Sequence, residues 1–576
     1  MNTLHLRAAI GLLQGIALYA LYRASNHIGW LALHPMLFSP LLLAAASLPL
    51  LCQTGLDAMR PSRLAAWLAA LAAVVAAVGA HDRWRAGLEN IARPDLMPGA
   101  SAVLGGGLLL FIAWPLILAG EGERRWRAAY PAYFDAAWKL GLQLALSSLF
   151  LGVFWLILFL GAELFSLVGI NGLRQLIEQS EFAIPASTLA LSAGLHLTDV
   201  RPGIIQGLRS LLLTLLSWLL PLLAMLIAAF LALLPFTGLD SLWKTGHASA
   251  LLLGASALLI FLLNTAYQDG RQASGRVIRL SQRAACLLLA PLQALAAYSL
   301  ALRVGQYGWS PERVFAACCV ALGACYAAGY GWAALRRSPG LPGVAAANVG
   351  AAWLSLALLF ALLTPLADPA RISVSSQLAR LQAGQANADR FDFDFLRYRG
   401  LRYGHAALLR LRDEPGMNVA IRRKAADALS EDKREAKPKT PAQAVRPRGQ
   451  TALPAGFLAQ DWKLAAKRAP ELPSCLQDGG DECDAYVGDY SGGGKAEVLL
   501  AEKLPARWSL FRQDAHGQWT LAATYDLPGA CQAPLDALAA GRARAVAPRL
   551  PDLEAGGLRL QPRYPRAERE CPAPRK

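Results

Sequence analysis

The sequence contains little charge for its length, and that charge is unevenly placed. Of its 576 residues, 17% are Asp, Glu, Lys or Arg, whereas 55% are hydrophobic and the mean hydropathy is +0.34. This composition excludes disordered, collagen-like and disulfide-scaffold proteins. Residues 1–366 hold 23 of the 56 basic and 14 of the 40 acidic residues, which leaves 33 and 26 for the last 210. The first two thirds therefore predict a polytopic membrane protein, and the last third a water-exposed part.

Catalytic and metal-binding signatures are also lacking. There is no H-E-x-x-H, no G-x-S-x-G and no Rossmann glycine fingerprint, and the eight histidines form no pair at helical spacing. The stretch DYSGGGKAE (489–497) fails as a phosphate loop because Ala496 replaces the required Ser or Thr, and as a calcium loop it keeps only Asp489 and Glu497. We interpret it as a glycine turn that enters a strand at Val498. The sequence favours a protein that is not an enzyme, and it predicts no cofactor and no metal.

Ten apolar runs are long enough to cross a bilayer, which takes about 20 residues of helix. The runs show no period-two alternation, so they predict helices rather than the strands of a barrel. They lie near residues 8–22, 36–53, 64–80, 101–120, 138–168, 209–236, 247–267, 284–303, 313–335 and 344–366. The fold class that we predict is an all-α membrane bundle of about ten transmembrane helices, followed by a small β-rich soluble domain.

Two of these regions are unusual. The fifth run has about 31 residues, enough to tilt or break within the bilayer. The stretch 170–208 contains only a short apolar piece, Ile184–Leu197, which is rich in small residues, and we expect it to be re-entrant or interfacial. Met1–Tyr22 lacks a small-residue cleavage site followed by a polar mature region, so we interpret it as the first membrane helix.

The distribution of basic residues gives a weak indication of orientation. Assigning the loops after spans one, three, five, seven and nine to one side gives that side thirteen Lys and Arg, and the other side ten. This small difference favours a topology in which both termini lie outside.

The cysteines divide between the apolar runs and the tail. Five lie in the apolar runs, where a free thiol behaves as a small hydrophobic group. An even set confined to the tail suits disulfides in an oxidising compartment, with three pairings open; unpaired thiols and a four-thiolate zinc site are the alternatives, although no C-x₂₋₄-C pair occurs. We predict two disulfides among Cys475, Cys483, Cys531 and Cys571, and a tail on the periplasmic side.

The tail divides into three parts after the transmembrane domain of residues 1–366. Residues 367–416 interleave Arg with Phe, Tyr and Leu, which next to a membrane indicates amphipathic helices at its surface rather than a nucleic-acid interface. Residues 417–455 form a charged, Pro-rich linker. Residues 456–576 predict a small β-rich domain. Its short strands are EVLLA, WSLFR and WTLAATY, and its expected core is Trp508, Phe511 and Trp519.

Three polar residues near the predicted spans are candidates for function. Glu163 near the end of the fifth span is a candidate intramembrane carboxylate, unless it reaches water. Asp199 and Arg201 in the TDVRPG stretch are placed to pair with one another, and the alternative is a capped turn.

The stretch YGWSPER (307–313) begins a predicted membrane helix. Ser310 suits the N-cap, and Pro311 and Glu312 suit the first turn. That account leaves Tyr307 and Arg313 as an interfacial aromatic and a snorkelling base, and with Glu312 they are further candidates.

Other residues in the spans predict helix packing rather than chemistry. Gly11 and Gly15 form a small-xxx-small face, and Asn264 and Asn348 are expected to hydrogen bond between helices.

Three stretches together resemble one bacterial membrane family. RVGQYGWSPERVFA (303–316), DPARISVSSQLARL (368–381) and FDFDFLRYRGLRYGHAALLRL (391–411) are similar to the family known as domain of unknown function 4153. The resemblance covers about residues 1–412 and implies a bacterial inner-membrane protein. It implies no activity, cofactor or catalytic residue, because the family has none established. Residues 456–576 lie outside it.

Two classes of function remain open at this point. The first is a non-enzymatic envelope component that presents its C-terminal domain to an envelope protein partner or signal. The second is a transporter of a small or lipid-like substrate. The spans are nearly free of charge and show no internal repeat, whereas transporters usually place ionisable or broken helices near the bilayer centre. We therefore expect the first class, with the lipid bilayer as a partner, no nucleic acid and an oligomeric state that the sequence leaves open.

Overall fold

The computed structural model describes most of the membrane part of the chain and much of the tail. The described residues are 3–26, 30–87, 96–238, 248–270, 275–336, 340–385, 391–415, 417–430, 444–448, 452–454, 456–462, 472–476, 482–502, 507–515, 517–526 and short pieces between 537 and 560. The chain divides into two compact units, Met1–Leu429 and Ser430–Lys576, and each is described by itself.

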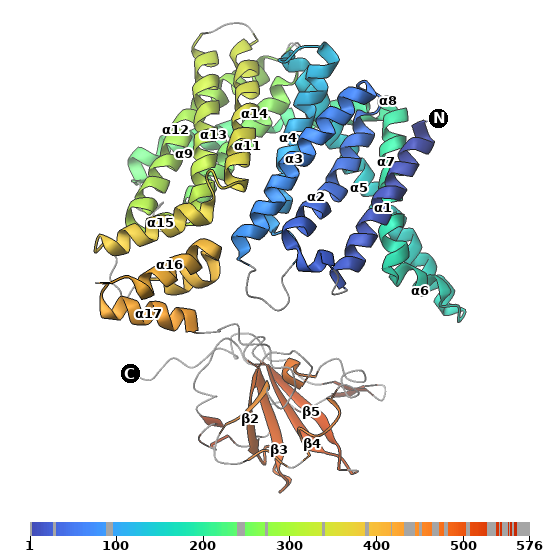
Figure 1. The fold of residues 1–576 in the computed structure, drawn as a ribbon, viewed down its shortest axis with the longest axis vertical. Helices are drawn as coiled ribbons and strands as arrows, with labels where there is room; N and C mark the ends of the chain where they lie inside the picture. Colours follow the sequence, from blue (N-terminus) through green and yellow to red (C-terminus); the bar gives the residue numbers. More distant parts are fainter. Residues whose placement is uncertain are drawn as a thin grey trace. The chain divides into compact units, whose positions relative to one another are not determined.

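Ten candidate membrane spans occur among the described residues, as the hydropathy predicted (Figure 1). Helices α8 and α9 follow one another with a break at Trp218 and count as one span. Proline stands in the first turn of six of the ten spans, where its missing N–H has no intrahelical partner to lose. The spans are α1 (Thr3–Asn26), α2 (Pro35–Gly55), α3 (Pro61–Ala86), α4 (Ala100–Glu123), α5 (Tyr130–Leu167), α8 (Pro202–Ser217) with α9 (Leu219–Thr237), α11 (Ala248–Tyr267), α12 (Arg276–Tyr307), α13 (Pro311–Leu335) and α14 (Pro342–Leu363).

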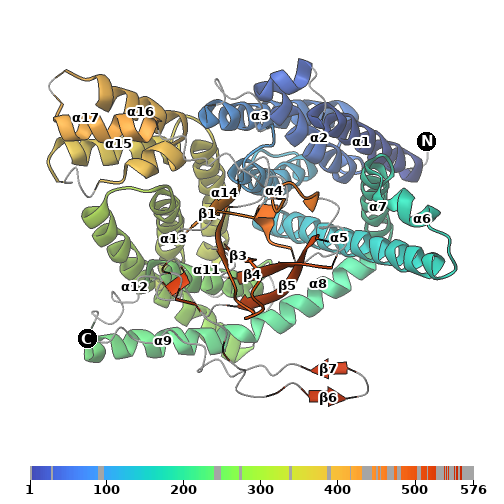
Figure 2. The ribbon, with the colours of Figure 1, turned by 90° about the horizontal axis from the view of Figure 1, so that it is seen from below.

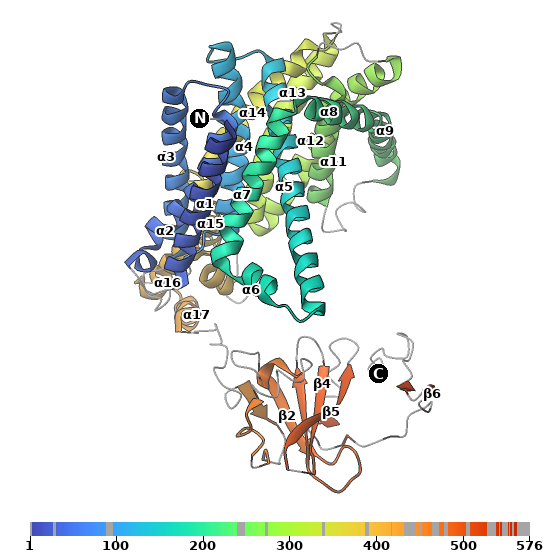
Figure 3. The same cartoon turned by 90° about the vertical axis from the view of Figure 1, so that its right-hand side faces the viewer.

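The region between the fifth and sixth predicted runs differs from the re-entrant or interfacial piece that the sequence suggested. A short helix α6 (Gly172–Glu178) is followed by α7 (Ser180–Val200), a continuous helix that runs beside α1 and α5 (Figure 3). At about 1.5 Å per residue its 21 residues reach about 31 Å, the thickness of the hydrocarbon core. Helix α5 is also unbroken over 38 residues.

Small residues explain why α7 has a low hydropathy for a membrane span and yet packs closely against its neighbouring helices. A Cβ added to Gly11 of α1 would lie 2.2 Å from the Ser192 hydroxyl, and one added to Gly15 would lie 2.4 Å from Cα of Pro185. On another face of α7, a Cβ on Gly194 would lie 3.0 Å from Cα of Ser147. The small residues let the backbones approach closely, which is how helices associate in lipid.

A group of shorter helices follows the last span beside the end of α3 (Figure 2). It comprises α15 (Pro369–Gln382), a π-helical turn (Phe395–Arg399), α16 (Leu401–Asp413) and α17 (Val419–Ser430). Their apolar faces share one core that includes Leu396, Leu408 and Ala425, all fully buried. Helix α17 lies inside the range 417–455 that the sequence suggested as a linker, because its apolar residues recur at helical spacing and pack on this core.

The second unit is built on a five-stranded sheet of order β1-β2-β3-β4-β5. β1 pairs with β2 in parallel, the other pairs are antiparallel, and β4 carries an irregularity at Leu510/Phe511. A second pair, β6 (Leu553–Ala555) with β7 (Leu558–Leu560), is separate. The strands are β1 (Val445–Pro447), β2 (Cys483–Gly488), β3 (Glu497–Glu502), β4 (Arg507–Gln513) and β5 (Trp519–Asp526).

The core of this sheet is aromatic on one face. Phe457 and Phe511 are fully buried with their rings 5.7 Å apart, and Trp462 and Trp519 lie against them at ring separations of 5.2–5.4 Å. Trp508 packs on the other face of the sheet, so the predicted core of three aromatics divides between two clusters.

The stretch 489–497 forms a turn that uses its own carboxylates. Asp489 accepts hydrogen bonds from the backbone amides of Gly493 and Gly494 at 2.9 and 2.8 Å. Glu497 accepts from the amides of Tyr490 and Ser491, both at 2.9 Å. The two acidic residues that resemble calcium ligands therefore close the turn that leads into β3.

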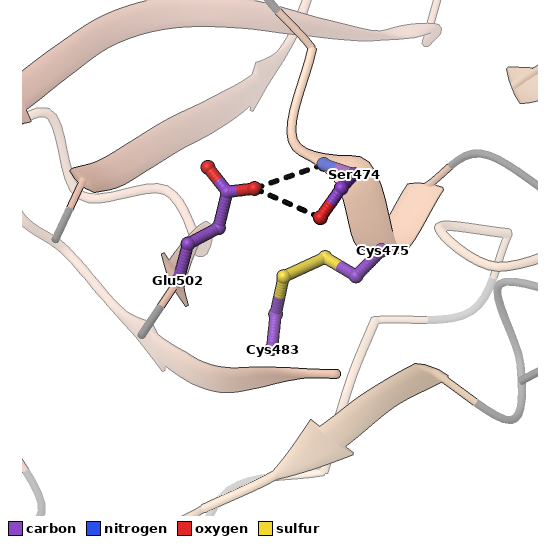
Figure 4. The surroundings of a disulfide bond; sticks show 4 residues. All are labelled: Ser474, Cys475, Cys483 and Glu502. Carbon is purple, nitrogen blue, oxygen red and sulfur yellow. Dashed lines mark hydrogen bonds between the residues drawn. A yellow bond between two sulfur atoms is a disulfide. The ribbon is translucent and has the colours of Figure 1, made fainter. Parts of the chain in front are cut away.

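One disulfide, Cys475–Cys483, joins a 3₁₀ turn to the start of β2 (Figure 4). Beside it Glu502 accepts hydrogen bonds from the Ser474 amide at 2.9 Å and hydroxyl at 3.1 Å. Cys531 and Cys571 lie outside the described residues, so the second predicted disulfide stays a prediction.

The close approach of α1 and α7 yields a test by substitution. We expect Gly11→Leu to lower the free energy of unfolding by about 1–3 kcal/mol, because a larger side chain must force the two helices apart. Gly152→Leu in α5 is the matched control, since a Cβ there meets nothing within 4 Å. Thermal unfolding of both purified variants in detergent measures the difference. Equal midpoints would contradict the tight packing of α1 on α7.

Candidate functional site

The first of two charge clusters, each built around a buried side chain, lies where the beginning of α1 meets the end of α7. Arg7 donates to Asp199 at 2.6 Å and to Asp57 at 2.8 Å, and Lys139 of α5 pairs with Asp199 at 2.7 Å. The Arg7 side chain is only 4% exposed. We call this set the Arg7 cluster; its members are Arg7, Asp57, Lys139, Gln143, His196 and Asp199.

The charges of the Arg7 cluster balance. Two cations, Arg7 and Lys139, face two carboxylates, Asp57 and Asp199. Removing an ion from water costs several kcal/mol, and a partner at hydrogen-bond distance is needed to offset that cost. The cluster therefore ties α1, α5 and α7 together near one end of the bundle.

The second cluster lies at the opposite end of α3, where this helix meets the start of α15. Asp368 is fully buried and accepts from His81 Nε2 at 2.8 Å, with Arg85 at 3.6 Å. It also caps α15 by accepting from the amides of Ala370 and Arg371 at 2.8 and 3.3 Å.

A second carboxylate, Asp82, completes this arrangement. It accepts from Arg83 at 2.6 Å, from Arg85 at 2.9 Å and from the amide of Gly99 at 2.8 Å, just before α4 begins. We call this set the Asp368 cluster; its members are His81, Asp82, Arg83, Arg85, Gly99 and Asp368. It holds the end of α3, the start of α4 and the start of α15 in one place.

Aromatic contacts extend the Asp368 cluster to the shorter helices. Trp84 lies edge-on to Tyr403 at 5.7 Å, and the guanidinium of Arg402 lies 4.8 Å from the Trp84 ring. On the other side of α15, Gln377 donates to the carbonyls of Tyr307 and Trp309, each at 3.0 Å. The helices after the last span are thus attached to the bundle at both α3 and the α12–α13 turn.

Opposing effects act on the ionisation of Asp368. Burial raises the pKa of this carboxyl, but the hydrogen bond from His81, the charge of Arg85 and two backbone amides outweigh burial. The net result is a pKa below the usual range of an aspartate, so Asp368 is charged at neutral pH.

A third polar set lies within the bundle and carries no charge. Asn348 donates to Asn264 at 2.6 Å and to the Tyr130 hydroxyl at 2.9 Å, while the Tyr330 hydroxyl donates to Asn348 at 2.5 Å. The predicted hydrogen bonding of Asn264 and Asn348 between helices is observed. These side chains bond one another, which satisfies them without water.

Glu163, Asp199 and Arg201 do not come together. Glu163 is exposed and lies 3.5 Å from Arg174. Asp199 pairs with Arg7 and Lys139 instead of the predicted partner Arg201, which ends α7 and has no ion pair with any residue that the structure describes. Each of these three predicted residues therefore lies at a different place in the fold.

Tyr307, Glu312 and Arg313 all lie near the α12–α13 turn. Glu312 pairs with Arg399 of the π-helical turn, and Arg313 lies over the Tyr307 ring at 5.4 Å while it donates to the Gly308 carbonyl at 2.7 Å. Ser310 occupies the N-cap of α13, but its side chain makes no capping hydrogen bond to the backbone.

The residues of greatest burial were missed by sequence reasoning. The sequence suggests that Arg7 is a charge flanking the first span. It suggests an interfacial loop for Asp82, Arg83 and Arg85. The only local signal for Asp368 is an Asp followed by Pro at the start of a helix, a common capping pattern. Nothing local indicates that its partner is His81, 287 residues earlier.

These features define a polytopic helical membrane protein with ion pairs at the ends of its helices. A family model described as "Domain of unknown function (DUF4153)" matches residues 9–410, and the chain belongs to this family. No curated protein and no solved structure matches the chain. The match covers the bundle and the helices up to α16, and it ends before the sheet.

Asp368 gives a stability prediction. We expect Asp368→Asn to lower the free energy of unfolding by about 1–3 kcal/mol, because the buried hydrogen bond with His81 loses its charged acceptor and Arg85 loses one of its two carboxylates. Asp413→Asn is the control, since that ion pair with Arg412 is exposed and should leave the unfolding midpoint unchanged. Thermal unfolding in detergent gives both values.

The pH dependence of the same variants provides the second part of this test. The pKa of Asp368 is depressed, so its contribution is present above an ordinary aspartate pKa and is lost as pH falls through the lower folded value. The wild-type protein should lose stability below about pH 4, and the Asp368→Asn variant should show a shallower slope there. Identical slopes would contradict the role assigned to Asp368.

Proposed function

We propose that this protein is a non-enzymatic component of the bacterial envelope, whose bundle lies in the inner membrane and presents the C-terminal unit on the periplasmic side. The observation that carries the proposal is the antiparallel packing of α7 along α1. Arg7 contacts Asp199 near one end, and Tyr19 donates to Glu181 at 2.6 Å near the other. Helix α7 thus accompanies a membrane span over most of its length.

If α7 crosses with α1, the chain crosses the membrane eleven times. An odd number places the N-terminus and the tail on opposite sides. The start of α1 and helix α15 do lie at opposite ends of the bundle (Figure 1). This replaces the topology with both termini outside, which followed from counting ten spans.

Counting α7 also strengthens the bias of basic residues. When α7 is counted as a span, every loop after it changes sides. The side of the N-terminus then holds fifteen Lys and Arg and the side of the tail eight, whereas the count of ten spans gave ten on the side of both termini and thirteen on the other. The N-terminal side then has Arg7, Arg60, Arg63, Arg124, Arg125, Arg127, Lys139, Arg201, Arg209, Arg271, Arg276, Arg279, Arg283, Arg336 and Arg337. An excess of this size favours a cytoplasmic N-terminus.

The disulfide supports the same orientation independently. Cys475–Cys483 lies in the second unit, and structural disulfides persist in oxidising compartments such as the periplasm. The basic-residue bias and the disulfide thus both favour a tail outside the cytoplasm.

The placement of charge supports an anchor over a transporter. Glu163 lies 24 residues along α5 from Lys139 (163 − 139), which corresponds to about 36 Å of helix. Because Lys139 pairs with Asp199, Glu163 and Asp199 do not line the same transport path. The Arg7 and Asp368 clusters are internally paired, and the Asn–Tyr set bonds to itself. Such groups hold helices in place, and within these three sets the described ionisable side chains already have partners.

A transporter of a lipid-like substrate is the second candidate. An apolar cavity of about 240 Å³ lies among α2, α3, α4 and α5, lined by residues such as Leu50, Val74 and Phe111. Its lining suits hydrocarbon and offers only hydroxyls such as Ser47 and Thr54 to a polar group. This favours an acyl chain over a charged solute.

Reporter fusions test the topology. Alkaline phosphatase fused after residue 170 or 430 should be active, and a fusion after residue 201 should be inactive, because α7 separates 170 from 201. A fluorescent protein that folds only in the cytoplasm should give the opposite pattern at the same sites. The same reporter activity at residues 170 and 201 would contradict the crossing of α7.

Complementation of a deletion strain tests the function. If the bundle serves to present the tail, a chain truncated after residue 430 should fail to restore the deletion phenotype, while Glu163→Ala and Arg201→Ala should each restore it. Membrane levels of each variant, measured by immunoblot, control for expression. A fully active truncation together with inactive Leu50→Asp and Val74→Asp variants present at normal level would instead favour the apolar cavity and transport.

A further inference from the structure

A second cavity, distinct from the apolar one, lies at the N-terminal end of the bundle. It has a volume of about 750 Å³ and lies among the α2–α3 turn, the end of α4 and α14. Its polar and aromatic lining consists of Arg60, Arg63, Arg124, Arg125, Glu121, Trp67, Trp126 and Trp353. We call it the Arg–Trp pocket.

The charge of the Arg–Trp pocket is uncompensated. Four arginines face one carboxylate, Glu121, and that carboxylate is already used: it accepts from Arg63 and from the Trp67 indole, each at 3.0 Å. The side chains of Arg60, Arg124 and Arg125 make no hydrogen bond or ion pair with any residue that the structure describes. Three cations therefore line one cavity without an acidic partner, an arrangement that favours an anionic ligand.

The backbone fixes two of these arginines. Arg124 ends α4 in the left-handed conformation at φ 52°, which is uncommon for a residue with a side chain. The amide of Arg125 then bonds back to the Gly120 carbonyl at 3.0 Å. This tight turn places two consecutive arginines at the rim of the pocket.

The remaining wall is aromatic and apolar. Trp126 is 75% exposed, and its ring stacks on Trp353 at 6.5 Å with an angle of 21° between the planes. Ile117 and Leu356 continue this wall along α4 and α14. Tryptophan gathers where hydrocarbon meets headgroups, so the pocket combines a cationic rim with a surface suited to acyl chains.

We propose that the Arg–Trp pocket binds the headgroup of an anionic phospholipid. Arg60, Arg124 and Arg125 hold the phosphate, and the first carbons of the chains lie against Trp126 and Trp353. Arginine suits this ligand because its planar guanidinium makes paired hydrogen bonds to phosphate oxygens. Basic pockets between membrane helices bind lipid headgroups in the same manner.

A free phosphate ester shares the anionic chemistry but leaves the aromatic wall unused. The two sources differ in their need for the bilayer, so the test includes both. The proposal does not depend on the function of the tail, because the pocket lies entirely within the bundle.

Native mass spectrometry of the full-length protein tests the proposal. The protein is reconstituted in nanodiscs of phosphatidylcholine containing phosphatidylglycerol, released, and scored for the lipids that it retains. The wild type should retain phosphatidylglycerol over phosphatidylcholine, and the double variant Arg124→Gln/Arg125→Gln should lose about tenfold of that retention, because two charge-assisted contacts are removed.

Arg276→Gln/Arg279→Gln is the matched control. It removes the same charge from exposed arginines at the start of α12, outside the pocket, and should retain the lipid as the wild type does. Inorganic phosphate at millimolar concentration, added to phosphatidylcholine nanodiscs, should leave no adduct. Equal losses in the two double variants, equal retention of both lipids, or a phosphate adduct that depends on Arg124 and Arg125 would each overturn the assignment.

Discussion

The need to partner every buried charge governs how this bundle is built. Hydrocarbon offers no water to solvate an ion, so each guanidinium and carboxylate at depth requires another side chain or the backbone. Asp368 meets that requirement by accepting bonds from His81 and from the first turn of α15, with Arg85 nearby. One side chain thereby connects a span to the helices beyond the membrane. The Arg7 cluster does the same for α1, α5 and α7, and together the clusters fix opposite ends.

Composition predicted the membrane class, the ten apolar spans and the small sheet, because each depends on local hydropathy or alternation. It did not predict α7. That helix is rich in Ala, Ser, Thr and Gly, and its low hydropathy reflects contact with protein rather than with lipid. Hydropathy averaged over a window measures how well a segment suits hydrocarbon. The contact between Gly11 and Ser192 depends instead on how closely two neighbouring helices fit together. The topology that we propose depends on that single helix.

The candidate site was less accessible to sequence reasoning than the fold. Glu163 drew notice because it is a carboxylate in an apolar run, yet it ends exposed beside Arg174. Arg7 and Asp199 are 192 residues apart, and nothing in either neighbourhood identifies the other. The Arg–Trp pocket likewise gathers residues from the α2–α3 turn, the end of α4 and the middle of α14. Patterns in sequence reveal residues whose partners are local, whereas these sets join segments that lie far apart in the chain.

The distance along the chain between Arg7 and its partners sets an order for biosynthesis. Helix α1 enters the membrane first, but Asp57 and Asp199 are translated 50 and 192 residues later. Until α7 packs on α1, Gly11 and Gly15 lack the neighbour that they contact most closely, and Arg7 lacks Asp199. The pairing of α1 with α7 is thus a late event in the synthesis of the bundle. A chain that ends before residue 180 would lack this helix pair altogether.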